Sequence, residues 1–184
     1  LGELIQIDGS PHDWFEGRRD KCCLLVFIDD ATGKLQHLRF EETETTKGYF
    51  SSMLGYIKQH GLPLALYSDK HSIFRVNAPE TEHECETQFK RAMDNLGVRI
   101  IYANSPQAKG RVERANGILQ DRLVKELRLA EIRDIEAANK FLPDFIEKYN
   151  QKFAVEPKSK TDAHRQLEAS DEELNLIFGT QSVR

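Results

Sequence analysis

The segment CCLLVFIDD (22–30) constrains the fold more than any other, because apolar, β-branched and aromatic residues follow one another almost without interruption. A run of this kind and length is typical of a central strand that is buried on both faces of a sheet. The turn ATGK (31–34) comes next, and LQHLRFEE (35–42) then alternates between apolar and polar residues like the second strand of a hairpin. Together with the apolar-rich run ELIQID (3–8), these segments predict an antiparallel meander at the start of the chain.

After the meander, helical and extended patterns alternate. Apolar residues recur at helical spacing from Thr45 to His60, and Gly61 is a typical helix stop. The later elements are expected as a strand over 64–69, a helix over 88–96, a strand over 98–103, a helix after residue 105, a helix over 135–149 that is broken or bent near Pro143, and the start of a further element at 171–178. This order predicts an α/β domain, in which helices pack on a mixed sheet.

The length of 184 residues, with 39% hydrophobic and 30% charged residues, is typical of one globular domain. We expect this domain to cover 1–150, with 151–184 as a C-terminal extension or the start of a following domain. No apolar run approaches the roughly 20 residues that cross a bilayer, and we expect no signal peptide. The chain begins at Leu1 rather than Met, so we expect it to be part of a longer protein.

The three cysteines are an odd number and form no CxxC pair. Cys22 and Cys23 are adjacent in an apolar run, which predicts buried free thiols and a reducing compartment such as the cytoplasm. Cys85 and His83 would need a second ligand pair to hold zinc, and none is visible in the sequence.

Charge is distributed unevenly along the chain. The net charge of −4 is unusual for a domain that binds nucleic acid. Between 105 and 128, however, cations outnumber anions, with Lys109, Arg111, Arg114, Arg122, Lys125 and Arg128 against Glu113, Asp121 and Glu126. Local charge steers a ligand more than total charge does, so this helix is a candidate surface for a polyanion.

Three acids are candidates for one metal site. Asp8 and Asp69 each follow an apolar strand run, and neighbouring strands would bring both carboxylates to the same edge of the sheet. Glu113 falls at the margin of an amphipathic helix. The expected buried stripe of that helix consists of Val112, Ala115, Leu119, Leu123 and Leu127.

Clustered carboxylates are typical ligands of Mg²⁺ or Mn²⁺, and two such ions can activate a hydroxyl and stabilise the leaving oxygen of a phosphodiester. Structural explanations also exist, because acids are common in turns and Glu113 could pair with Lys109. Asp29 and Asp30, which precede the ATGK turn, are expected to be turn or capping acids.

Four segments resemble the catalytic core of the DDE integrase and transposase superfamily, especially bacterial insertion-sequence transposases, and also retroviral integrases. They are QIDGSPHDWF (6–15), VFIDDATGKL (26–35), LYSDKHSIF (66–74) and ANSPQAKGRVERANGILQDRL (103–123). They cover most of residues 3–128, and the fourth is the most specific.

The resemblance implies a ribonuclease H-like fold, with a mixed five-stranded sheet flanked by helices, and an integrase-like catalytic core over 1–150. It implies Asp8, Asp69 and Glu113 as catalytic residues and as ligands of two Mg²⁺ or Mn²⁺ ions. The implied partners are double-stranded DNA, as transposon ends and target, and further copies of the chain. The implied location is the bacterial cytoplasm, at the nucleoid.

Residues expected to contact DNA surround these acids. Gln107 and Lys109 fall in the loop that approaches DNA in such enzymes, and Asn116 lies one turn after Glu113. The remaining candidates are Arg111, Arg114, Lys70 and His71, whereas Arg122 and Lys125 lie farther from the acid. A solvated helix face is the alternative for the arginines, and a loop histidine without a role is the alternative for His71.

Two features depart from the pattern of the family. Asp69 and Glu113 are separated by 43 residues, more than in compact retroviral integrases, and the polar segment 70–86 accounts for the excess. Many relatives carry Asp-Asn-Gly where this chain has Asp69-Lys70-His71. Just past Asp8, Asp13 and His12 could shape the site, whereas Trp14 is expected to pack in the core.

The sequence therefore predicts a transposase or integrase catalytic domain that frees a 3′-hydroxyl at a transposon end and joins it to target DNA. One alternative is a ribonuclease H-like nuclease that stops at hydrolysis. The other is a non-catalytic module for DNA binding or assembly. The presence of Asp8, Asp69 and Glu113 favours an enzyme.

Overall fold

The computed structural model describes residues 1–68, 87–102 and 110–179. Within these ranges the elements are β1 (Leu4–His12), β2 (Cys22–Asp29), β3 (Leu35–Glu41), α1 (Thr46–His60), β4 (Ala65–Ser68), α2 (Gln88–Asn95), β5 (Arg99–Tyr102), α3 (Gly110–Leu129), α4 (Ile135–Phe153) and α5 (Asp171–Ile177). None of the described helices is long and apolar enough to cross a membrane.

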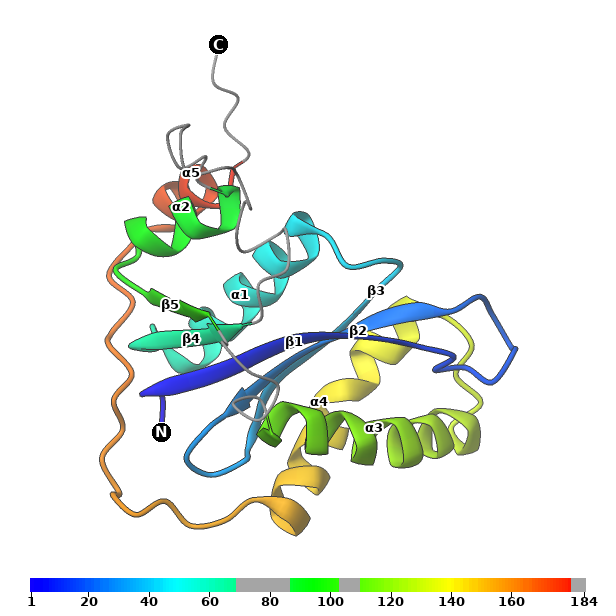
Figure 1. Ribbon diagram of the computed structural model, residues 1–184. Helices are drawn as coiled ribbons and strands as arrows, with labels where there is room; N and C mark the ends of the chain where they lie inside the picture. The colour runs from blue at the N-terminus through cyan, green and yellow to red at the C-terminus, as the bar shows by residue number, and fades with distance from the viewer. Residues whose placement is uncertain (69–86, 103–109, 180–184) are drawn as a thin grey trace.

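The strands form one five-stranded sheet in the order β3-β2-β1-β4-β5 (Figure 1). β2 pairs antiparallel with both β1 and β3, which confirms the predicted meander. β4 pairs parallel with β1 and β5, so the sheet is mixed, as predicted.

Each face of the sheet is covered by its own group of helices. β2 contributes buried side chains to both faces of the sheet, because all eight of its residues are buried and successive side chains point to opposite faces. Cys23, Leu25 and Phe27 pack in a core cluster with α1, α2 and Leu174 of α5. Leu24 and Val26 pack in a second cluster with α3 and α4, and Figure 1 shows the two helix groups on either side of the strands.

Local signals set the ends of α1 as the sequence predicts. The Thr45 side chain accepts a hydrogen bond from the Gly48 backbone N–H and thus caps the first turn. Gly61 ends the helix with a φ of 89°, in the region where a side chain would be strained.

β1 is longer than the sequence predicts. Its pairing with β2 continues through Ser10↔Leu24 to His12↔Cys22, whereas its pairing with β4 ends at Gln6↔Tyr67. The expectation that the strand ends at Asp8 is therefore wrong. The antiparallel partner β2 extends β1 through Gly9 and Pro11, where the apolar pattern has already stopped.

α4 continues through Pro143 to Phe153, so of the two predicted outcomes, a break or a bend, the break is wrong. Two asparagines of this helix bind the outer edge of β3. Asn139 accepts from the Phe40 N–H at 2.7 Å and donates to its carbonyl at 3.0 Å, and Asn150 makes the same pair of bonds to Leu35, each at 2.8 Å. Three helical turns and five strand residues both span roughly 16 Å, so the two spacings match.

After α4 the chain runs extended and returns across the domain to α5, which lies beside α2 (Figure 1). Leu62 and Arg165 exchange backbone hydrogen bonds of 2.9 and 2.8 Å. Leu174 then buries its side chain in the core, with 2% exposure. The division of the chain near residue 150 stays a prediction.

Candidate active site

β1 and α3 are joined by three side-chain hydrogen bonds at regular intervals. The bonds run from Val112 N to Gln6 Oε1 (3.0 Å), from Asn116 Nδ2 to Asp8 Oδ2 (2.9 Å), and from Gln120 Nε2 to Ser10 Oγ (3.1 Å). Alternate residues of a strand advance about 6.6 Å, and residues four apart on a helix advance about 6 Å. The two periods coincide here, so one face of β1 lies along one face of α3.

This contact places Glu113 near the level of Asp8. Glu113 directly follows Val112, whose backbone bonds β1, and it precedes Asn116, which bonds Asp8, by three residues. Residues three apart share a helix face. Glu113 is exposed and Asp8 is partly exposed, so both carboxylates lie at the surface of the β1–α3 junction.

Asn116 contributes more than its bond to Asp8. Its Oδ1 atom is buried and has no hydrogen-bond partner among the described residues. A buried acceptor without a partner costs free energy and is a feature to explain. A carbonyl oxygen beside a carboxylate is suited to contact a hard cation or the water bound to it.

Several predicted site residues lie outside the described ranges. These are Asp69, Lys70, His71, Gln107 and Lys109, together with His83 and Cys85. Among the residues that the structure describes, no three His, Cys, Asp or Glu side chains form a group that could hold a metal ion. The complete triad therefore stays a prediction.

The buried stripe of α3 agrees with the prediction, because each of its five members is at most 1% exposed. Arg111 and Arg114 are exposed at the start of the helix and form no ion pair with any described residue. Farther along, Arg122 lies over the ring of Phe153 at 5.3 Å from its centroid.

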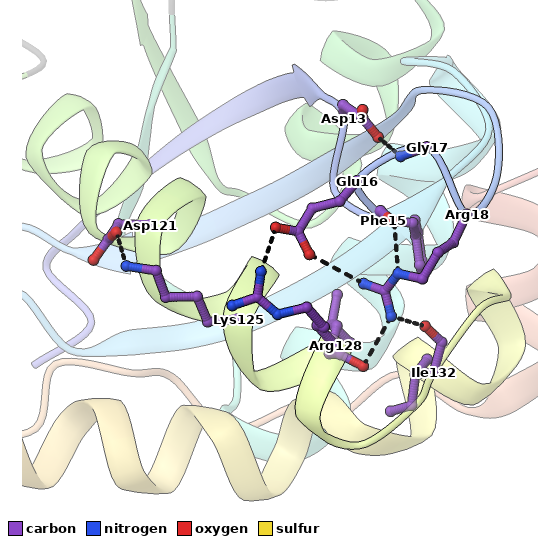
Figure 2. A network of polar contacts seen from close by, with 10 residues as sticks. Asp13, Phe15, Glu16, Gly17, Arg18, Asp121, Lys125, Arg128 and Ile132 are labelled. Atoms are coloured by element: carbon purple, nitrogen blue, oxygen red, sulfur yellow. Dashed lines mark hydrogen bonds and ion pairs between the residues drawn. The ribbon is translucent and has the colours of Figure 1, made fainter.

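The far end of α3 carries a network of polar contacts with the β1–β2 connection (Figure 2). Arg18 donates to the carbonyls of Phe15 (2.7 Å), Ile132 (3.0 Å) and Leu127 (3.4 Å). Arg128 donates to Glu16 at 2.9 Å. The network connects the C-terminal end of α3 to the β1–β2 connection and places a cation where the helix dipole favours one.

Lys125 and Asp121 form a separate pair one turn earlier on the exposed face, also visible in Figure 2. The hydrogen bond and the charge of Lys125 lower the pKa of the Asp121 carboxyl. Each of these two exposed charges therefore already has a partner on the same helix.

The two acids before the ATGK turn have different roles. Asp29 accepts from the Thr32 N–H and hydroxyl and from the Gly2 N–H, so the prediction of a turn acid is confirmed. Asp30 instead accepts a 2.6 Å hydrogen bond from the Gln6 side chain. Sequence reasoning overlooked Gln6, which looks like an ordinary polar residue in a strand.

Cys22 and Cys23 are buried free cysteines, as predicted. Burial raises the pKa of Cys22 to about 11 and that of Cys23 to about 12. Both thiols are therefore neutral at ordinary pH and unsuited to nucleophilic attack. Trp14 is fully buried and donates to the Ser10 carbonyl at 3.0 Å, which confirms its packing role.

Solved structures share this fold. The catalytic core domain of HTLV-2 integrase, in complex with magnesium, superposes with a TM-score of 0.63 at 21% identity. The match covers 86% of this chain and 92% of that one. The molecule thus has the ribonuclease H-like fold of an integrase catalytic core.

Two bacterial transposases are similar to this chain in sequence. "Putative transposase y4bF" of Sinorhizobium fredii is 53% identical over all 184 residues, which span 40% of that protein. The transposase for insertion sequence IS1202 of Streptococcus pneumoniae is 39% identical over 160 residues, 85% of this chain and 34% of that protein. No family model matches the chain. The chain is thus similar over most or all of its length to two bacterial transposases, and it spans less than half of the length of either.

Proposed function

We propose that the chain is the catalytic part of a DNA transposase, which cuts transposon ends and joins the freed 3′-hydroxyl to target DNA. The observation that carries the proposal is the Asp8–Asn116 hydrogen bond, which seats a carboxylate against the helix that bears Glu113. The relatives named as transposases support this reaction class.

Asp8, Asp69 and Glu113 would hold Mg²⁺ or Mn²⁺ in this proposal. The donor chemistry fits, because carboxylate oxygens and the buried Asn116 Oδ1 are hard ligands or acceptors for metal-bound water. Counting two residues onward from the pair Gln6↔Tyr67 leads to Asp8 and Asp69, so the parallel register favours a shared edge. The integrase core with magnesium supports the same type of ion. When bound, such ions activate the attacking oxygen and stabilise the leaving one.

The residues of the chain hold and orient the reactants. Asn116 donates to Asp8 Oδ2 and so fixes the orientation of that carboxylate. Arg111 and Arg114 are exposed beside Glu113 and would contact DNA phosphates. Gln107, Lys109, Lys70 and His71 complete the proposed DNA contacts. Catalysis would thus depend on positioning and on charge stabilisation.

The proposed partners are double-stranded DNA and further copies of the chain. The integrase core used for comparison was solved in a dimeric form, which supports an oligomer. The bacterial relatives support action at the nucleoid in the cytoplasm.

Two measurements test the proposal. Calorimetric titration with Mn²⁺ should show binding that is lost in Asp8→Asn and retained in the matched control Asp121→Asn, whose carboxylate already pairs with Lys125. Duplexes that mimic the ends of the encoding element should be cut and joined to a target duplex. Cutting without joining would favour a hydrolytic nuclease. No Mn²⁺ binding and no cutting would favour a non-catalytic module.

A further inference from the structure

Gln6 is buried between β1 and α3, with 2% exposure, two residues before Asp8. Both ends of its side-chain amide are used. Its Oε1 accepts from the Val112 backbone N–H at 3.0 Å, and its Nε2 donates to Asp30 Oδ1 at 2.6 Å. The side chain thus connects the first turn of α3 to the turn that follows β2.

The bond from Val112 to Gln6 satisfies a backbone donor in the first turn of α3. α3 begins at Gly110, so the Val112 N–H belongs to the first turn, where backbone donors have no partner within the helix. Such donors are usually satisfied by a capping side chain from the preceding residues. Here the acceptor comes from a strand residue 106 positions away in the sequence. The start of α3 is therefore attached directly to β1, the strand of Asp8.

The bond from Gln6 to Asp30 fixes the orientation of the Gln6 side-chain amide. An amide placed between a donor and an acceptor has one favourable orientation, because its oxygen faces the donor and its nitrogen faces the acceptor. Asp30 is itself tied to β1, since its N–H donates to the Leu4 carbonyl at 3.0 Å. The carboxylate of Asp30 thus directs the Gln6 oxygen toward Val112.

We propose that Gln6 and Asp30 form a clamp that fixes the first turn of α3 and thereby sets the position of Glu113 relative to Asp8. Gln6 is then a positioning residue, which acts through the helix and not on the DNA. The consequence for catalysis rests on the function proposed above, in which Glu113 holds metal. The consequence for the helix does not depend on it.

The test compares Gln6→Leu with Asn139→Leu. Each change removes a side-chain amide that bonds a distant backbone group, and only the first lies at the start of α3. Hydrogen–deuterium exchange should increase over 110–116 in Gln6→Leu and stay at the wild-type level there in Asn139→Leu. Mn²⁺ binding and the kcat of end cutting should fall by about tenfold in Gln6→Leu, with little change in KM, as is typical when a group that orients a ligand is lost.

Exchanging the amide of Gln6 and the carboxylate of Asp30 tests whether their hydrogen bond can be restored in the opposite direction. Gln6→Glu places a carboxylate against that of Asp30 and should loosen the same turn. Adding Asp30→Asn supplies an amide donor to the introduced carboxylate, which should restore exchange protection and activity. Asp30→Asn by itself should have little effect, because its carbonyl oxygen still accepts from Gln6.

The outcomes separate the two claims. Unchanged exchange over 110–116 in Gln6→Leu, or an equal change in Asn139→Leu, would overturn the clamp. Increased exchange in Gln6→Leu supports the clamp even if the wild-type chain neither binds Mn²⁺ nor cuts DNA, a result that would overturn the proposed function only. Increased exchange with undiminished Mn²⁺ binding would overturn the link to Glu113.

Discussion

Charged residues at the two ends of α3 differ in whether they form ion pairs. At the start, Arg111, Glu113 and Arg114 are exposed and form no ion pair with any described residue. Near the other end, Lys125 pairs with Asp121 and Arg128 pairs with Glu16. Sequence composition alone does not distinguish these ends, because both mix acids with bases.

This difference in ion pairing indicates which charged side chains of α3 are available to bind a ligand. A charge that already has a partner loses that interaction when it binds something else, whereas an unpaired charge at a surface exchanges only water. The first turns of α3 are therefore suited to bind, and the last turns are suited to hold the helix in place. Between these two ends, three side-chain hydrogen bonds hold α3 against β1.

The largest predicted effect on the rate of end cutting comes from replacing the acid at the start of α3, with an acid near the other end as the control. If Glu113 holds metal as proposed, Glu113→Gln should lower the rate of end cutting at least about a hundredfold, because the loss of such a ligand removes about 3 kcal/mol or more of transition-state stabilisation. Glu126→Gln, on the same helix, should change the rate by less than about twofold. Single-turnover cutting assays measure both. Equal losses would remove the functional distinction between the two ends.

Removing Arg18 tests the structural end of the helix. Arg18→Met should lower the free energy of unfolding by about 2–3 kcal/mol, because three carbonyls lose a charged donor. Urea denaturation measures the loss, and Mn²⁺ affinity well below the unfolding midpoint should remain at the wild-type value. A change in stability below about 0.5 kcal/mol would show that the network is not a structural support.

The cations at the two ends should respond differently to DNA. Arg111→Gln and Arg114→Gln should each weaken DNA binding by several-fold and reduce the slope of log affinity against log salt by about one. Lys125→Gln should leave the slope unchanged, because Lys125 pairs with Asp121. Fluorescence anisotropy across a salt series measures the slopes. Identical slopes for all three variants would contradict the assignment.

The smallest predicted effect concerns pH. Lys125 holds the pKa of Asp121 below its ordinary value of 3.8, so the pair adds stability above that pH and loses it as pH falls through the lowered pKa. Lys125→Met should return the pKa toward the ordinary value, which NMR titration of the carboxyl would detect. Stability at neutral pH should barely change, because both side chains are exposed. An unshifted carboxyl in the unsubstituted chain would show that the pair does not form in solution.

Much of the fold could be predicted because short-range patterns determine it. The apolar run of β2, the stripe of α3 and the caps of α1 each reflect one local requirement, and each is present in the structure. The extension of β1 to His12 could not be predicted, since it depends on pairing with β2 and not on its own pattern. The continuity of α4 through Pro143 likewise depends on packing against β3 and α3.

The candidate site was predictable in part. Asp8, Glu113 and Asn116 are recognisable from their motifs, and the structure brings Asp8 against Asn116. Gln6 and Arg18 were missed because the partners that attach them to α3 lie more than 100 residues away, at separations of 106 for Val112 and 109 for Leu127. A polar side chain whose role depends on a distant backbone group leaves no local signal in a single sequence.

The two asparagines of α4 that bond β3 also affect whether another strand can pair at this edge of the sheet. Asn139 and Asn150 occupy the backbone donors and acceptors of Phe40 and Leu35, so another chain finds no strand partner there. Open-ended fibre growth needs two free sheet edges on every molecule. Because these groups of β3 are already bonded to α4, growth through this part of the edge is disfavoured.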